Sequence, residues 1–314
     1  MLKLVKGRLL QLVILLFCLS LMTFTLMKLA PGDPVLLILQ ADELAVTQEE
    51  EAALREELGF NQPILHQYGQ WMKQLLQLDL GVSYIKGKPV LKELKDRFPA
   101  TLQLTLGGII VMILISAPLG ILAARYAGRW PDHLSRFLAL LGASVPAFWL
   151  GLILIYIFAY KLQWVPTMGK GGFQHIILPS IASGFGMASV YARLLRSGLL
   201  DSLSQEYIRA ARGRGLAEWR IYLIHGLRAA LLPVVTVFGM SLGSVLGGTV
   251  IIETLFSWPG LGRMVVDAIF QRDYPIIQGY ILLTGLCVVI VNLLVDLSYG
   301  LLDPRIRHGK GEIR

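Results

Sequence analysis

The stretch SQEYIRAARGRGLAEWRIYLIHGLRAALLP, residues 204–233, sets the organisation of this chain, and its first part is SQEYIRAARGRGL at 204–216. It is polar and basic, yet it lies between two long apolar segments. Four of its side chains are predicted to line one side of a short helix: Tyr207, Ala210, Ala211 and Leu216. Gly213 and Gly215 mark a bend, because glycine relaxes the backbone and weakens a helix. The apolar stripe indicates a docking surface. The alternative is a solvated loop that arginines such as Arg209 keep on the inner side of the membrane.

The composition predicts an all-α polytopic membrane protein. Of the 314 residues, 55% are hydrophobic and 16% are charged, with a mean hydropathy of +0.62. Ordinary soluble domains carry about 25% charged residues. The net charge of +8 is explained by basic loops on the cytoplasmic side of a membrane, so it does not indicate a nucleic-acid partner.

Six apolar runs are long enough to cross a bilayer, which takes about 20 helical residues. The predicted spans cover residues 9–27, 99–124, 137–160, 176–196, 232–252 and 279–302. The second span contains Pro118, and the third contains SVP at 144–146, which predicts a kink. The resulting division is 1–30 for the N-terminal segment and first span, 31–98 for a polar loop, 99–302 for a five-helix core with a loop at 197–231, and 303–314 for a basic tail.

The polar segment 31–98 is acidic, with 11 acidic and 7 basic residues, although the whole chain is basic. Residues 47–58 read as an amphipathic helix, with Thr47 at the N-cap and Glu50 at the capping-box position. Gly59 is expected to stop this helix. Residues 63–78 are a second helical candidate, so the segment is predicted to form a small helical domain outside the membrane.

The basic residues indicate which ends of the spans face the cytoplasm. The segments 1–8, 125–136, 193–228 and 303–314 carry 17 Lys and Arg between them, whereas 161–175 and 253–275 carry 2 each. Short loops rich in Lys and Arg stay on the cytoplasmic side. Both termini and the 204–216 stretch are therefore predicted to be cytoplasmic.

Five residues are candidates for a translocation path: His175, Gly243, Gly247, Glu253 and Asp296. The two glycines continue a small-residue ridge from Gly239 at every fourth position, which lets helices approach closely. The alternative for this ridge is ordinary packing within the chain. Ionisable residues at membrane depth are functional candidates, although a structural pairing is the leading interpretation for Asp296 and hydrogen bonding at the interface is the leading one for His175.

No catalytic constellation is visible. The chain contains no Walker A sequence and no HExxH, and Cys18 and Cys287 offer no metal-ligand spacing. The sequence therefore predicts neither an enzyme nor a bound cofactor, and no metal site is assigned. A stand-alone secondary transporter remains an alternative, but the spans hold few of the charged relays it needs.

Eight motifs follow one another along the chain: APGDP (30–34), LGFNQP (58–63), DLGVS (79–83), PATL (99–102), AARGRGL (210–216), FSWPGLG (256–262), RDYP (272–275) and LDPRIR (302–307). Together they resemble the membrane permease subunit of dipeptide, oligopeptide and nickel ABC importers. The resemblance covers essentially the whole chain and implies the type I importer permease fold in a bacterial cytoplasmic membrane.

The resemblance also implies a role for the 204–216 stretch. Residues 204–233, which include it, correspond to the loop whose coupling helix docks on the ATPase subunit. The implied docking residues are Tyr207, Arg209, Ala210, Ala211, Gly215 and Leu216. Arg209 departs from the family pattern, which has Glu there. The implied partners are a second homologous permease, two ATPase subunits that bind ATP and Mg, and an extracytoplasmic binding protein.

The cargo is predicted less directly. The segment QWVPTMGKGGFQHIILP, residues 163–179, looks closer to nickel permeases than to dipeptide permeases, and the compact length agrees. Nickel, free or chelated, is therefore the leading hypothesis, and a dipeptide or oligopeptide is the alternative.

Overall fold

The computed structural model describes residues 2–29, 35–36, 39, 47–57 and 59–302. Within these, only the helical backbone is described at 2–6, 8–9, 240, 242–248 and 296–302. The chain divides into two compact units. The first unit combines Met1–Ala100 with Pro259–Val289, and the second combines Thr101–Trp258 with Ile290–Arg314.

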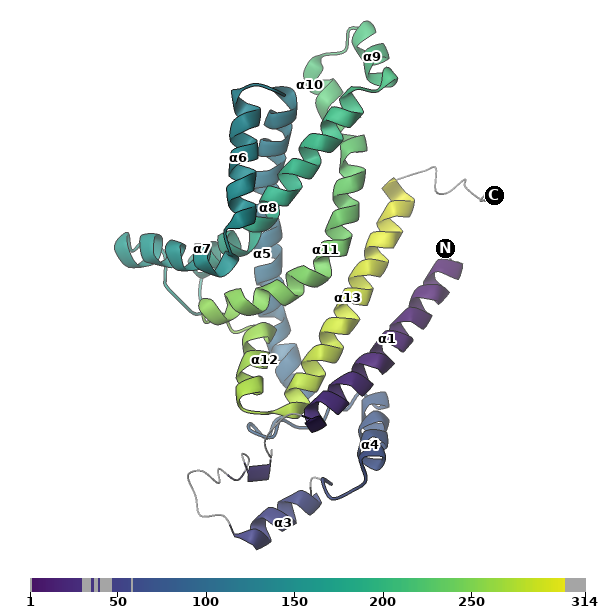
Figure 1. Ribbon diagram of the computed structural model, residues 1–314, viewed down its shortest axis with the longest axis vertical. Helices are drawn as coiled ribbons and strands as arrows, with labels where there is room; N and C mark the ends of the chain where they lie inside the picture. The colour runs from purple at the N-terminus through teal and green to yellow at the C-terminus, as the bar shows by residue number, and fades with distance from the viewer. Residues whose placement is uncertain (1, 30–34, 37–38, 40–46, 58, 303–314) are drawn as a thin grey trace. The chain divides into compact units, whose positions relative to one another are not determined.

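The regular secondary structure of the described residues is helical, as predicted, and one isolated bridge joins Val82 and Pro89. Figure 1 shows the elements in chain order. The helices are α1 (Leu2–Leu29), α3 (Gln48–Glu57), α4 (Ile64–Leu76), α5 (Val90–Arg125), α6 (Trp130–Ser144), α7 (Ala147–Leu154), η1 (Ile155–Lys161), α8 (Gln174–Leu203), α9 (Glu206–Gly213), α10 (Glu218–Arg220), η2 (Ile221–Gly226), α11 (Leu227–Leu255), α12 (Leu261–Phe270) and α13 (Tyr274–Leu302).

Five described helices are long and apolar enough to cross a membrane, or six if the bent pair α6 and α7–η1 counts as one span. This agrees with the six predicted spans, although the kink expected at residues 144–146 is a break with a bend of 99°. Val145 is extended (φ −87°, ψ 119°) because a following proline disfavours the helical conformation. Pro146 then becomes the N-cap of α7.

Several boundaries differ from the sequence prediction. Helix α5 begins at Val90, nine residues before the expected Pro99, so part of the 31–98 loop belongs to a long helix. Helix α6 begins at Trp130 inside the predicted basic turn, with a proline in its first turn, where the missing N–H has no helical partner to lose. The segment between the last two predicted spans, residues 253–278, contains helix α12.

The first unit is held together by aromatic and apolar contacts. Phe24 of α1 meets Tyr68 of α4 edge to face at 5.3 Å between ring centroids, and the hydroxyls of Ser20 and Tyr68 lie 2.9 Å apart. A separate apolar core joins the start of α5 to α12 and the start of α13: Val90, Leu94, Leu261, Met264, Val265, Ala268, Ile276 and Ile277. Met27 of α1 packs against the edge of this core.

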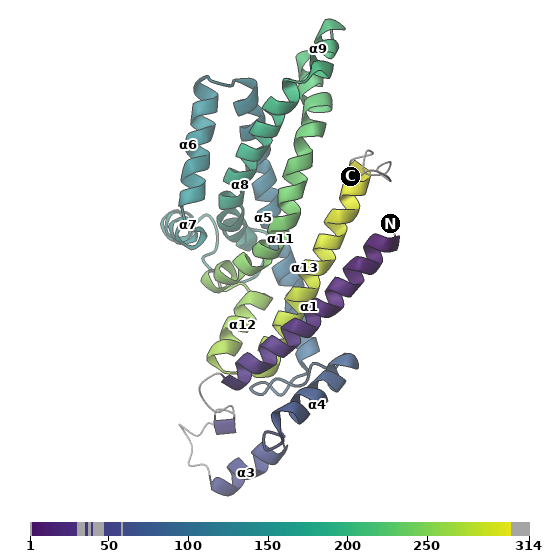
Figure 2. The ribbon, with the colours of Figure 1, turned by 45° about the vertical axis from the view of Figure 1, so that its right-hand side comes forward.

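In the second unit, α8 packs against α6, α7 and α11. The long helices α6, α8 and α11 of this unit are seen side by side in Figures 1 and 2. Helix α9 lies beyond the end of α8 in both views, and α10 leads from it back into η2 and α11. The chain therefore places the 204–216 stretch at one end of this helix group.

Candidate functional site

The short helix predicted within residues 204–216 is present as α9. Gln205 precedes it in an extended conformation (φ −71°, ψ 152°), and Glu206 supplies a negative charge in the first turn, where the helix dipole favours one. The carbonyls of Ala210 and Arg212 accept hydrogen bonds from the N–H of Arg214. The helix is thus only two turns long and depends on its contacts with neighbouring elements.

One side of α9 is buried on the ends of α8 and η2. Ile208 is fully buried and Ala211 is 8% exposed, and both pack with Ile221. Leu203 and Leu216 cover the edge of this cluster. Residues 208, 211 and 221 come from α9 and η2, so the loop carries a small apolar core of its own.

The structure corrects the predicted apolar stripe. Ala211 belongs to the buried side of α9, whereas Ala210 and Tyr207 are exposed. Leu216 is half-buried and lies beyond the end of the helix, after Gly215. Residues three and four positions apart share one side of a helix only approximately, and Ile208 takes the inward position. The four predicted residues therefore do not form one exposed stripe.

Two side-chain contacts and the backbone conformation of one glycine fix the loop around α9. The hydroxyls of Tyr207 and Ser202 lie 2.7 Å apart, which ties the helix to the end of α8. Arg212 donates hydrogen bonds to Glu218 through Nε (2.8 Å) and Nη2 (3.3 Å), and this pairing raises the pKa of the guanidinium. Gly215 has φ +73°, a left-handed conformation in which a side chain is strained. The predicted bend is confirmed at Gly215.

The exposed surface of α9 is basic with small apolar patches. Arg209 and Ala210 are exposed on the helix, and the side chain of Tyr207 is 46% exposed. Arg214 and Arg220 add further exposed positive charge close by. Such a rigid helix with its outer side uncovered has the geometry of a docking element.

Glu253, one of the five path candidates, lies in the interior of the second unit. Glu253 is fully buried, and its Oε1 accepts a hydrogen bond of 2.6 Å from the hydroxyl of Thr101. Its backbone carbonyl also accepts a hydrogen bond from the N–H of Trp258. A buried carboxylate needs hydrogen-bond partners, so this contact stabilises the interior of the second unit.

Of the remaining path candidates, His175 is the one whose surroundings the structure describes. His175 is half-buried at the start of α8, with its ring against Gly171. Gly239 packs tightly on Val295, since an added Cβ would lie 2.3 Å from its Cγ1. The glycine ridge therefore begins as ordinary packing between α11 and α13. The surroundings of Gly243, Gly247 and Asp296 lie outside the described part of these helices.

A buried ion pair near the start of α6 was missed by sequence reasoning. Asp132 accepts hydrogen bonds from Nε (2.6 Å) and Nη2 (2.8 Å) of Arg196, and from the N–H of Gly128 (2.8 Å). Its side chain is 1% exposed, and Arg136 lies 3.4 Å away. The pair joins α6 to α8, two turns before the end of α8. The signal in the sequence was Asp132, an acidic residue within the basic segment 125–136, where it is expected to need a basic partner.

No three His, Cys, Asp or Glu side chains among the described residues are grouped closely enough to hold a metal ion.

Two family models match the chain. Residues 116–308 match the binding-protein-dependent transport system inner membrane component, and residues 1–105 match the N-terminal part of such a membrane component. The chain is 42% identical over 308 residues to glutathione transport system permease proteins GsiC of Escherichia coli strain K12 and Shigella dysenteriae serotype 1. Each match covers 98% of this chain and 100% of the relative.

The fold is also similar to a solved structure, an inward-facing conformation of the MetNI methionine ABC transporter. The TM-score is 0.58 at 17% identity, with 68% of this chain and 97% of the other covered. This likeness shows the type I importer permease fold. The motifs, the fold and the family models agree, and the chain belongs to the family of binding-protein-dependent transport system inner membrane components of ABC importers.

Proposed function

We propose that this chain forms part of the translocation path of an ATP-driven importer for short peptides or peptide-like molecules. The single observation that carries the cargo class is the 42% identity over nearly the full length to glutathione transport permeases. These relatives favour the peptide alternative, and nothing in them supports the nickel preference drawn from residues 163–179. A binding protein delivers the cargo, ATPase subunits supply the energy, and a second permease subunit completes the path.

The exposed side of α9 is the docking site for an ATPase subunit. The support is its geometry: a short helix, anchored on one side by Ile208 and Ala211, with Arg209 and Ala210 uncovered on the other. This assignment places α9 and both chain termini on the cytoplasmic side of the membrane, in line with the excess of Lys and Arg there.

The anchoring explains how a movement of α9 reaches the spans. Ile208 and Ala211 pack on Ile221, which leads directly into η2 and α11, while Tyr207 is tied to Ser202 of α8. A displacement of α9 by closing ATPase subunits is therefore passed to α8 and α11 together. The path then alternates between inward and outward access by rigid-body movement of packed helices.

The docking role is tested by a charge on the exposed side of α9. Ala210→Glu places a carboxylate there without touching the buried cluster, and Ala127→Glu is a matched control on another exposed turn of the same unit. We expect Ala210→Glu to lower copurification of the ATPase subunits severalfold and to abolish peptide uptake. The control is expected to assemble normally. Normal assembly and uptake of Ala210→Glu would contradict the docking role.

A further inference from the structure

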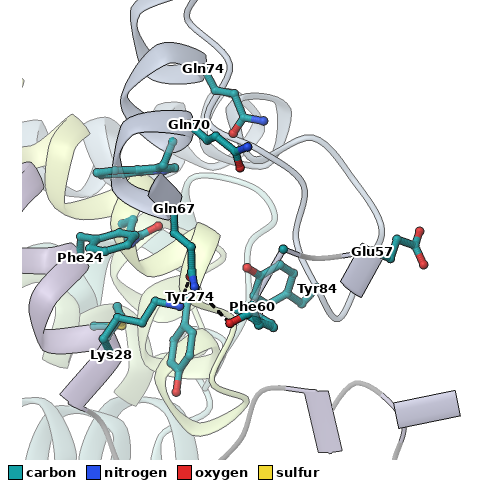
Figure 3. A pocket seen from close by; sticks show the side chains of 13 residues that line it. Phe24, Lys28, Glu57, Phe60, Gln67, Gln70, Gln74, Tyr84 and Tyr274 are labelled. Carbon is teal, nitrogen blue, oxygen red and sulfur yellow. Dashed lines mark hydrogen bonds between the residues drawn. The ribbon is translucent and has the colours of Figure 1, made fainter. Parts of the chain in front are cut away.

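A cavity of about 280 Å³ lies within the first unit. Its walls come from the end of α1, from the end of α3 at Glu57, from α4, from the loop that precedes α4, from Tyr84 and from the start of α13. Figure 3 shows the lining side chains gathered around it. The volume is close to the lower end of the range of small-molecule sites, roughly 300–1,000 Å³.

One face of α4 supplies three carboxamides to this cavity. Gln67, Gln70 and Gln74 lie at intervals of three and four residues, which places them on the same side of the helix with Trp71 between them. Gln67 is fixed, since its Nε2 donates to the carbonyls of Phe60 (3.1 Å) and Gln62 (2.7 Å). A carboxamide both donates and accepts hydrogen bonds, so it complements a peptide group.

Aromatic rings form the rest of the wall. Phe24 stacks on Trp71 at 6.0 Å between ring centroids, and Phe60 meets Tyr84 edge to face at 6.3 Å. Burial, together with Asp273 and Tyr274 nearby, raises the pKa of Tyr84 to about 12. Its phenol therefore stays protonated and able to donate. Rings of this kind offer a rigid apolar surface with a polar tip.

Lys28 adds a positive charge at the edge of the cavity. Its Nζ donates to Oε1 of Gln67 and lies 4.7 Å from the ring centroid of Phe60 and 5.7 Å from that of Phe24. An ammonium group carries three N–H donors. The two rings attract its charge, but they are weaker acceptors than a carboxylate. The ammonium is held toward the cavity by Gln67, as Figure 3 shows.

We propose that this cavity binds a short peptide through its free C-terminal carboxylate. The carboxylate lies against Lys28, the peptide groups meet the carboxamides of Gln70 and Gln74, and an apolar side chain lies against Trp71 and Tyr84. The site rests on the proposed function, because it takes the same cargo class. An anionic lipid headgroup shares the carboxylate's charge, and the experiment separates the two sources.

The probe is the dipeptide Ala–Phe, compared with its C-terminal amide, which lacks the carboxylate. Binding is measured by calorimetry on the assembled importer without its binding protein, in discs of zwitterionic lipid. We expect Lys28→Gln to weaken Ala–Phe binding roughly ten- to a hundredfold, the worth of a hydrogen bond to a charged group. The amide is expected to bind as weakly to the wild type and to be unaffected by Lys28→Gln.

Two further variants test the proposal if Lys28→Gln assembles poorly. Gln74→Ala removes a carboxamide from the cavity and is expected to weaken Ala–Phe binding severalfold. Lys73→Gln removes a charge from an exposed part of α4 that does not line the cavity, and it is expected to bind normally. The proposal would be overturned if the wild type bound Ala–Phe and its amide equally well. It would also be overturned if the Lys28→Gln and Gln74→Ala variants bound Ala–Phe as tightly as the wild type.

The lipid alternative has its own outcome. If discs containing anionic phosphatidylglycerol retain that lipid in a Lys28-dependent way and Ala–Phe does not bind, the cavity is a lipid site and the proposal is wrong. Peptide uptake by the same complexes, with binding protein and ATP, is measured in parallel. Uptake without Lys28-dependent binding refutes the cavity site alone, whereas absence of peptide uptake refutes the proposed function.

Discussion

The hydroxyl of Ser83 donates a hydrogen bond of 2.5 Å to the carboxylate of Asp273, although the two residues are 190 positions apart. The N–H of Tyr84 donates to the other carboxylate oxygen at 3.1 Å. Ser83 and Asp273 are both buried. They belong to the DLGVS and RDYP motifs, so two stretches that identify the family meet in one contact and close the first unit around its apolar core.

Removing the carboxylate of Asp273 is predicted to destabilise the first unit. Asp273→Ala leaves the hydroxyl of Ser83 and the N–H of Tyr84 without this acceptor, at a cost of about 1–3 kcal/mol for each buried group left unpaired. The expected result is a clear fall in the thermal midpoint of the detergent-solubilised protein. Asp96→Ala changes an exposed carboxylate of α5 and serves as the control. Equal midpoints for the two variants would contradict this role.

The buried pair Thr101–Glu253 gives a prediction that separates packing from transport. Thr101→Val removes a donor to a fully buried carboxylate and is expected to destabilise the second unit by about 1–3 kcal/mol. Thr254→Val, on the exposed side of the same stretch of α11, is expected to cost far less. The readout is again the thermal midpoint. If Glu253→Gln left stability unchanged but abolished uptake, Glu253 would belong to the path after all.

The ion pair between Asp132 and Arg196 is predicted to hold α6 against α8. Arg196→Met leaves the carboxylate of Asp132 buried without its main partner. The expected loss is on the order of 2 kcal/mol, less than the 3–5 kcal/mol of a fully buried pair, because Arg196 is 23% exposed. Arg193→Met, one turn earlier and exposed, is the control. A thermal midpoint unchanged by Arg196→Met would show that the pair is not needed.

Local features of the fold were predictable from the sequence. The capping box is confirmed, since the N–H of Glu50 donates to the hydroxyl of Thr47 (3.3 Å) and the N–H of Thr47 donates to Glu50 (3.0 Å). Gly59 ends the helix with φ +70°. Residues 63–78 contain helix α4, as expected. Each of these depends on residues within one or two turns of one another.

Features that depend on distant partners were not predictable. The burial of Ala211 requires Ile221 on another element, and the burial of Glu253 requires Thr101, which is 152 positions away. The bend at Pro146 was predicted, but its size of 99° was not, because the packing of α7 against α8 sets the direction of the chain beyond it. The sequence shows the regular spacing of the glutamines on α4. That they line a cavity becomes clear only from the aromatic side chains that form its other walls.

The measurement that tests the central claim most directly is uptake by the complete importer in proteoliposomes. The two permeases, the ATPase subunits and the binding protein are reconstituted with a labelled dipeptide or with radioactive nickel. We predict ATP-dependent accumulation of the dipeptide, lost in Ala210→Glu and retained in Ala127→Glu. Accumulation of nickel without the dipeptide, or dipeptide uptake that needs neither ATP nor the ATPase subunits, would contradict it.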